Sequence, residues 1–137
     1  RELDGVKWYN DSIATSPTRT MAGLDSFPGN LVLLAGGYDK KIPFEPMVPK
    51  ILEKVRELIL CGATADKIRQ AVTSHPDYNP DRLLILEAQN LDEAVQIARS
   101  QARPGDIVSL SPACAAFDQF VDFEARGRYF KQLVQAM

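Results

Sequence analysis

The sequence predicts one α/β domain with a mostly parallel sheet and helices on both of its faces. Short continuous apolar runs, such as residues 31–35 and 58–60, are typical of strands that are covered on both faces. Helical patterns separate these runs, and such alternation forms right-handed β-α-β units. A chain of 137 residues suits a single domain with its own core, so we assign residues 1–137 to one unit.

The elements follow in order from local signals. Asp4-Gly5 predicts a hairpin whose second arm is a strand over residues 6–10. Most of its first arm would lie before Arg1, which indicates a sequence cut from a longer chain. Ser16-Pro17-Thr18 predicts the start of a helix that ends near Phe27-Pro28-Gly29.

Strands and helices alternate through the rest of the chain. After the strand over residues 31–35, one helical pattern comprises Met47, Val48, Ile51, Leu52 and Val55. Further strands are expected over residues 58–60, 83–86 and 106–110, with helices over residues 65–74 and 91–102. A closing helix is marked by Phe123, Phe130, Leu133, Val134 and Met137.

Composition argues against two classes of function. Sixteen basic and eighteen acidic residues leave a net charge of -2, and no basic stripe is present, so neither nucleic acid nor a membrane surface is an expected partner. No apolar run is long enough to cross a bilayer, and no signal peptide is visible. Cys61 and Cys114 each follow a predicted strand, which favours reduced thiols in a cytosolic protein.

Unusual segments follow three of the predicted strands: residues 9–12 (YNDS), 36–41 (GGYDKK) and 111–114 (SPAC). In a parallel sheet the carboxyl ends of the strands meet at one edge, where ligands bind. Each segment also has a simpler explanation as a turn, a helix cap or a solvated charge. The strand ends at Gly62 and Gln89-Asn90 look like plain connections.

The strongest nucleotide-binding and metal-binding signatures are missing from the sequence. No GxGxxG follows a strand, and no GxxxxGK[ST] phosphate loop occurs. His75 has no His or Cys partner at metal-ligand spacing, so we predict no metal site. The residues alone therefore indicate an α/β domain with a ligand-binding face.

Taken together, three segments resemble the C-terminal domain of the Mur ligase family, in the same order and over the whole chain: residues 9–18 (YNDSIATSPT), 34–40 (LAGGYDK) and 110–120 (LSPACAAFDQF). The last of these, with Phe123-Glu124-Ala125-Arg126-Gly127 after it, is the most specific. Within the family the similarity is greatest to members that add D-glutamate to UDP-N-acetylmuramoyl-L-alanine. The resemblance thus implies a ligase of cytoplasmic peptidoglycan synthesis, and with it a role in cell wall biogenesis, cell shape and cell division.

The resemblance also implies a domain organisation. Family members have a UDP-binding domain, a central ATPase domain and a Rossmann-like C-terminal domain, and this chain resembles the third alone. In the family ATP phosphorylates the precursor's carboxylate, and the amino acid's amine attacks the acyl phosphate. ATP and Mg are held mainly by the central domain. We therefore expect a monomeric ligase whose isolated third domain has no catalytic residue and is inactive.

The same resemblance assigns site residues. Lys40 matches the family lysine that grips one D-glutamate carboxylate, and Thr15 matches its hydroxyl partner. The other carboxylate is expected near Ala116, Phe117 and Phe123, against backbone N–H groups. Residues near the ATP ribose and phosphates are matched by Asn10, Asp11 and Ser12.

Two residues depart from the family pattern. Ile13 stands where the family usually has a lysine, and Arg19, about one helical turn downstream, is a candidate to replace that charge. Ala116 stands where a serine is often found, which leaves only backbone donors at that position.

Two alternatives to a ligase domain stay open at this point. One is a stand-alone Rossmann-like module that binds a nucleotide or an anion without catalysis. The other is a thiol enzyme built on Cys114. Acyl activation on phosphate needs no enzyme thiol, so under the ligase interpretation Cys114 is a small structural residue packed inward.

Overall fold

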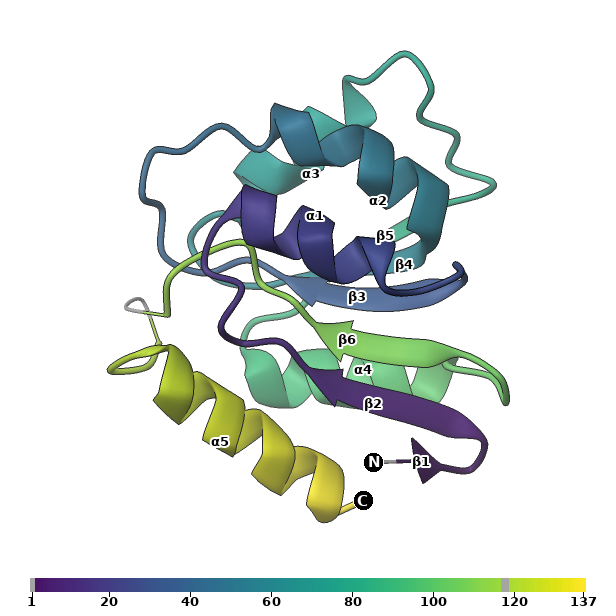
Figure 1. The fold of residues 1–137 in the computed structure, drawn as a ribbon, viewed down its shortest axis with the longest axis vertical. Helices are drawn as coiled ribbons and strands as arrows, with labels where there is room; N and C mark the ends of the chain where they lie inside the picture. The colour runs from purple at the N-terminus through teal and green to yellow at the C-terminus, as the bar shows by residue number, and fades with distance from the viewer. Residues whose placement is uncertain (1, 117–118) are drawn as a thin grey trace.

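A computed structural model describes residues 2–116 and 119–137. The strands in this part of the chain are β1 (Glu2–Leu3), β2 (Val6–Asn10), β3 (Leu31–Ala35), β4 (Val55–Leu60), β5 (Leu84–Glu87) and β6 (Ile107–Leu110). They form one sheet in the order β1-β2-β6-β3-β4-β5 (Figure 1). Only β1 runs antiparallel to its neighbour, so the prediction of a mostly parallel sheet with an N-terminal hairpin strand is confirmed.

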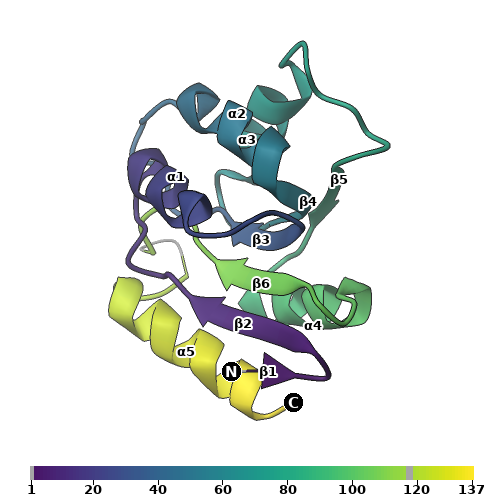
Figure 2. The same cartoon turned by 45° about the vertical axis from the view of Figure 1, so that its right-hand side comes forward.

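Helices cover both faces of this sheet. Their bounds are α1 (Pro17–Asp25), the 3-10 turn η1 (Glu45–Met47), α2 (Val48–Lys54), α3 (Ala65–Thr73), α4 (Leu91–Gln101) and α5 (Phe123–Gln135). The first three α-helices lie on one face, whereas α4 and α5 lie on the other (Figures 1 and 2). The predicted three-layer arrangement is therefore confirmed.

The central strands explain why the sequence shows unbroken apolar runs. Successive side chains of a strand point to opposite faces of the sheet. Leu31 and Leu33 pack under α1, α2 and α3, while Val32 and Leu34 pack against α4 and α5. Because every residue of β3 is buried, all five positions must be apolar.

Two helices end earlier than the sequence patterns predict. Val55, predicted in a helix, begins β4 with extended angles, φ -103° and ψ 130°, because it pairs with Leu31 of β3. The helix predicted to end near Phe27-Pro28-Gly29 ends at Asp25. Proline disfavours helical angles in the residue before it, so a helix ending ahead of Pro28 is the expected outcome.

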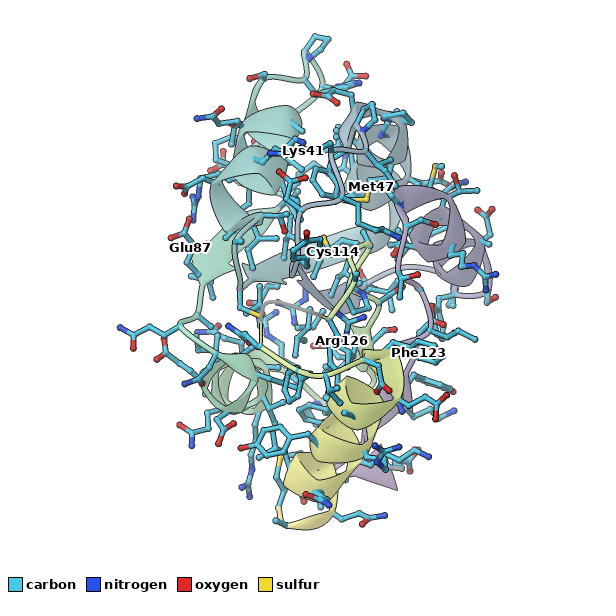
Figure 3. The ribbon with its side chains drawn as sticks, turned by 90° about the vertical axis from the view of Figure 1, so that its left-hand side faces the viewer. Lys41, Met47, Glu87, Cys114, Phe123 and Arg126 are labelled. Carbon is cyan, nitrogen blue, oxygen red and sulfur yellow. The ribbon has the colours of Figure 1, made fainter. Side chains whose placement is uncertain are left out.

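Parallel pairing brings the ends of five strands to one edge of the sheet. Since β6 lies between β2 and β3, the segments that follow these three strands are neighbours. Figure 3 looks onto this edge, with Cys114 and Arg126 near its centre and Phe123 at the start of α5. No helix in residues 2–116 and 119–137 combines the length and apolar character needed to cross a membrane.

Candidate functional site

Three loops at the carboxyl edge of the sheet, which we call the strand-end loops, make up the candidate site. They are residues 11–16 after β2, 36–44 after β3, and 111–116 with 119–122 after β6. Backbone hydrogen bonds join them: Ala113 donates to the carbonyl of Ala14 at 3.0 Å, and Tyr38 donates to the carbonyl of Ala115 at 2.9 Å. The loops therefore form one connected surface.

Gly36 and Gly37 are required by close backbone approach. Gly36 has φ +113°, and a Cβ there would lie 1.9 Å from the carbonyl oxygen of Cys61. Gly37 has φ +154°, and a Cβ there would lie 2.6 Å from the carbonyl oxygen of Ala115. Only glycine combines these conformations with these contacts, which explains the pair after β3.

Thr64 joins the site from a loop that the sequence did not single out. Its side chain is fully buried, and its Oγ1 accepts a hydrogen bond from the Gly37 N–H at 3.0 Å. The same oxygen lies 3.2 Å from the Sγ of Cys114. The connection at Gly62, expected to be plain, therefore also supports the loop after β3 through Thr64.

Cys114 packs inward, as expected of a structural residue. It is 1% exposed, so its thiol offers no open face to a substrate. Its Sγ lies 3.2 Å from the Thr64 hydroxyl, however, so the surroundings of the thiol are not purely apolar.

Arg126 is a second residue to which sequence reasoning gave no role. It lies in the first turns of α5, is 4% exposed, and donates hydrogen bonds to Ser12 and to the carbonyl of Cys114. The sequence did contain one indication of its importance, because Arg126 lies within residues 123–127, which follow the most specific of the three segments.

The three residues proposed to approach a nucleotide differ in their availability. Asn10 is exposed at the end of β2, but its Oδ1 accepts a hydrogen bond from the Ser12 N–H at 3.1 Å and its Nδ2 donates to the carbonyl of Gly127 at 3.4 Å. Asp11 is partly buried, and its Oδ2 accepts a hydrogen bond from the Ser111 hydroxyl at 2.9 Å. Burial raises the pKa of Asp11, while the Ser111 hydrogen bond and the charge of Arg19 act in the opposite direction.

Ser12 is engaged inside the fold. It is 4% exposed, and its hydroxyl donates to the carbonyl of Phe123 at 2.7 Å. The hydroxyl also accepts a hydrogen bond from Arg126. The geometry thus gives Ser12 the task of holding α5 against the first strand-end loop.

Four of the five residues proposed to hold the amino acid are described by the structure, and these four lie along this edge. Thr15 is half-buried, Lys40 is exposed, and Ala116 is buried, whereas Phe117 lies outside the described residues. Phe123 is half-buried at the first position of α5. A hollow of about 300 Å³ brings together Asn10, Ser12, Ile13 and Phe123 at this position.

The loop that carries Lys40 is fixed by its neighbours. Asp39 accepts a hydrogen bond from the backbone of Lys41 at 2.8 Å and forms an ion pair with Lys67 of α3 at 3.4 Å. The Lys41 backbone hydrogen bond, together with both lysine charges, lowers the pKa of Asp39. Within the described residues Lys40 itself forms no ion pair, so its charge faces solvent.

The donor set fits partial contact with a nucleotide better than a complete site. Asn10 is exposed and Asp11 is partly buried at this edge, but the sequence has no phosphate loop. The described part of the chain holds no cluster of three or more His, Cys, Asp or Glu side chains suited to a metal ion.

Comparison with known proteins identifies similar chains. The sequence model of the family described as "Mur ligase, glutamate ligase domain" matches residues 1–114. The chain is 50% identical over 137 residues to a UDP-N-acetylmuramoylalanine--D-glutamate ligase from Clostridium botulinum strain Okra, covering 100% of this chain and 30% of that protein. It is 54% identical to a protein of the same name from Symbiobacterium thermophilum, covering 100% of this chain and 29% of the relative.

The chain therefore spans only about 30% of the length of these curated relatives. A solved structure is also similar: a domain attributed to a UDP-N-acetylmuramate:L-alanyl-gamma-D-glutamyl-medo-diaminopimelate ligase of Haemophilus ducreyi. It superimposes with a TM-score of 0.60, covering 97% of this chain and 95% of the other at 13% identity. At that identity the likeness concerns the fold alone.

Proposed function

We propose that this chain, which belongs to the Mur ligase family through its glutamate ligase domain, receives D-glutamate in a ligase that acts on UDP-N-acetylmuramoyl-L-alanine. The names of the relatives support this proposal. ATP-dependent amide formation, a cytoplasmic location and a role in peptidoglycan synthesis belong to the proposal, because they concern the whole protein.

The observation that carries the proposal is the connected surface of the strand-end loops, which includes the exposed Lys40. D-Glutamate brings two carboxylates and one amine. We assign one carboxylate to the ammonium of Lys40 and the hydroxyl of Thr15, since charge-assisted hydrogen bonds are the strong ones.

We assign the other carboxylate to backbone N–H groups near Ala116 and Phe123. Phe123 occupies the first position of α5, where the helix dipole favours an anion. The Asp122 side chain already accepts a hydrogen bond from the Ala125 N–H at 2.7 Å, so the assignment is to the N–H groups ahead of Ala125. Binding both carboxylates in this way leaves the amine free to react.

The proposed reaction is amine attack on an acyl phosphate. The nitrogen forms a bond to the carbonyl carbon, the bond from that carbon to the phosphate oxygen breaks, and phosphate leaves while the amine loses a proton. ATP, with Mg²⁺, supplies the phosphoryl group, and we assign their binding mainly to parts of the protein outside this chain. The task of this domain is to orient the nucleophile, which converts a bimolecular encounter into a positioned reaction.

An isotope experiment on the full-length ligase tests this function. UDP-N-acetylmuramoyl-L-alanine labelled with ¹⁸O in its free carboxylate is incubated with ATP and D-glutamate. We expect phosphate release that depends on D-glutamate, with one ¹⁸O atom in each phosphate released, and little turnover with L-glutamate. Unlabelled phosphate would contradict the acyl phosphate, and turnover that ignores D-glutamate would contradict the proposed substrate.

A further inference from the structure

The buried guanidinium of Arg126 contacts two of the strand-end loops and lies beside the third. Its Nε donates to the Ser12 hydroxyl at 3.0 Å, and its Nη2 donates to the carbonyl of Ser12 at 2.9 Å. The same Nη2 donates to the carbonyl of Cys114 at 2.9 Å. A Cβ added at Gly37 would lie 3.3 Å from Nη1, so the loop after β3 packs directly against the group.

Ser12 extends this contact to the start of α5. Its hydroxyl accepts from Arg126 and donates to the carbonyl of Phe123 at 2.7 Å. The residue after the arginine reinforces the arrangement: a Cβ added at Gly127 would lie 3.2 Å from the Cβ of Ser12. The helix therefore packs closely on the first loop through a glycine and is held there by the adjacent arginine.

Each residue proposed to bind the amino acid lies two or three positions along the sequence from a residue of this Arg126 contact network. Thr15 follows Ser12, Lys40 follows Gly37, and Ala116 follows Cys114. Phe123 precedes Arg126 by three residues. Arg126 itself is 4% exposed, so it acts through these neighbours rather than by touching a substrate.

We propose that Arg126 is a positioning residue for amino-acid binding, whose buried guanidinium sets the relative places of the three strand-end loops and the first turn of α5. This inference rests on the proposed function. Arginine suits the role better than lysine, because its planar fork donates in several fixed directions at once. A lysine ammonium retains the charge but cannot reproduce the geometry of these bonds.

The test uses the full-length ligase with three variants. Arg126→Lys preserves the charge, Arg126→Met removes it, and Arg99→Met is the control, since Arg99 is an exposed arginine near the end of α4. Michaelis constants are measured for D-glutamate and for UDP-N-acetylmuramoyl-L-alanine, and urea unfolding reports the folded fraction of each variant.

For Arg126→Lys we expect the KM for D-glutamate to rise by at least about tenfold, while the KM for the UDP precursor changes by less than about threefold. Arg99→Met should leave both constants unchanged. If Arg126→Met does not fold, the lysine variant still decides the question.

Two results would overturn the inference. In one, folded Arg126→Lys has an unchanged KM for D-glutamate; in the other, activity falls only in proportion to the folded fraction. A wild-type enzyme without D-glutamate-dependent turnover would instead refute the proposed function, and this inference would fall with it.

Discussion

Replacing Gly36 with alanine probes the close approach of two backbones beneath the strand-end loops. The new Cβ would lie 1.9 Å from the Cys61 carbonyl oxygen, whereas a carbon–oxygen contact is normally about 3.3 Å or longer. The backbone there is held by two hydrogen bonds, from Gly36 to Pro112 at 2.9 Å and from Cys61 to Ala35 at 3.1 Å. Relief of the clash must therefore weaken one or both of them.

The cost of the substitution has two parts. The positive φ alone costs an alanine about 1–3 kcal/mol. Disturbing two backbone hydrogen bonds adds about 1–3 kcal/mol, at roughly 0.5–1.5 kcal/mol each. We expect Gly36→Ala to lower the free energy of unfolding by about 2–6 kcal/mol, a large share of the roughly 5–15 kcal/mol typical of a domain.

Gly29→Ala is the matched control. Gly29 also has a positive φ, +144°, but a Cβ there meets nothing within 4 Å. Urea unfolding of the domain should show Gly36→Ala to be less stable than Gly29→Ala by at least about 1 kcal/mol, with similar m-values. Equal destabilisation of the two variants would refute the reasoning from close approach.

Two further predictions concern other buried groups. Glu57 is 2% exposed, and burial raises its pKa above the ordinary 4.5, although the charge of Arg56, 3.3 Å away, acts in the opposite direction. The folded state therefore binds this proton more tightly than the unfolded state, so the stability Glu57 contributes is lost as pH rises through the folded pKa. Glu57→Gln should flatten the fall in unfolding free energy measured as the pH rises above 4.5, and an unchanged slope would contradict this account. Cys114, at 1% exposure, should resist alkylation in the native protein and react only in urea, while the less buried Cys61 reacts first; rapid native labelling of Cys114 with loss of turnover would restore the thiol-enzyme alternative.

The fold was predictable because its signals are local. The run at residues 31–35 is apolar at every position since both faces are covered, and Asp4-Gly5 does form the turn of the first hairpin. Helix ends were less certain, because Val55 satisfies the helical pattern and also favours a strand. Pairing with β3 then decided the outcome.

The polar interior of the site could not be predicted in the same way. Thr64 contacts Cys114 across 50 residues of sequence, and Arg126 contacts Ser12 across 114. No periodicity marks residues that meet only through tertiary packing. The motifs did locate the strand-end loops correctly. They did not indicate that Ser12 is engaged within the fold, because an Asn-Asp-Ser segment looks the same in sequence whether its side chains face a ligand or a helix.

The most direct test of the central claim compares Lys40→Ala with Lys41→Ala in the full-length ligase. Lys41 is an apt control because its side chain is 86% exposed and its ammonium lies 3.8 Å from Asp39. If Lys40 holds a D-glutamate carboxylate, its loss should raise the KM for D-glutamate by at least about tenfold and barely change the KM for ATP. Lys41→Ala should leave both constants near their wild-type values. Equal effects of the two substitutions, or a Lys40 effect confined to ATP, would contradict the claim that the strand-end loops bind the amino acid.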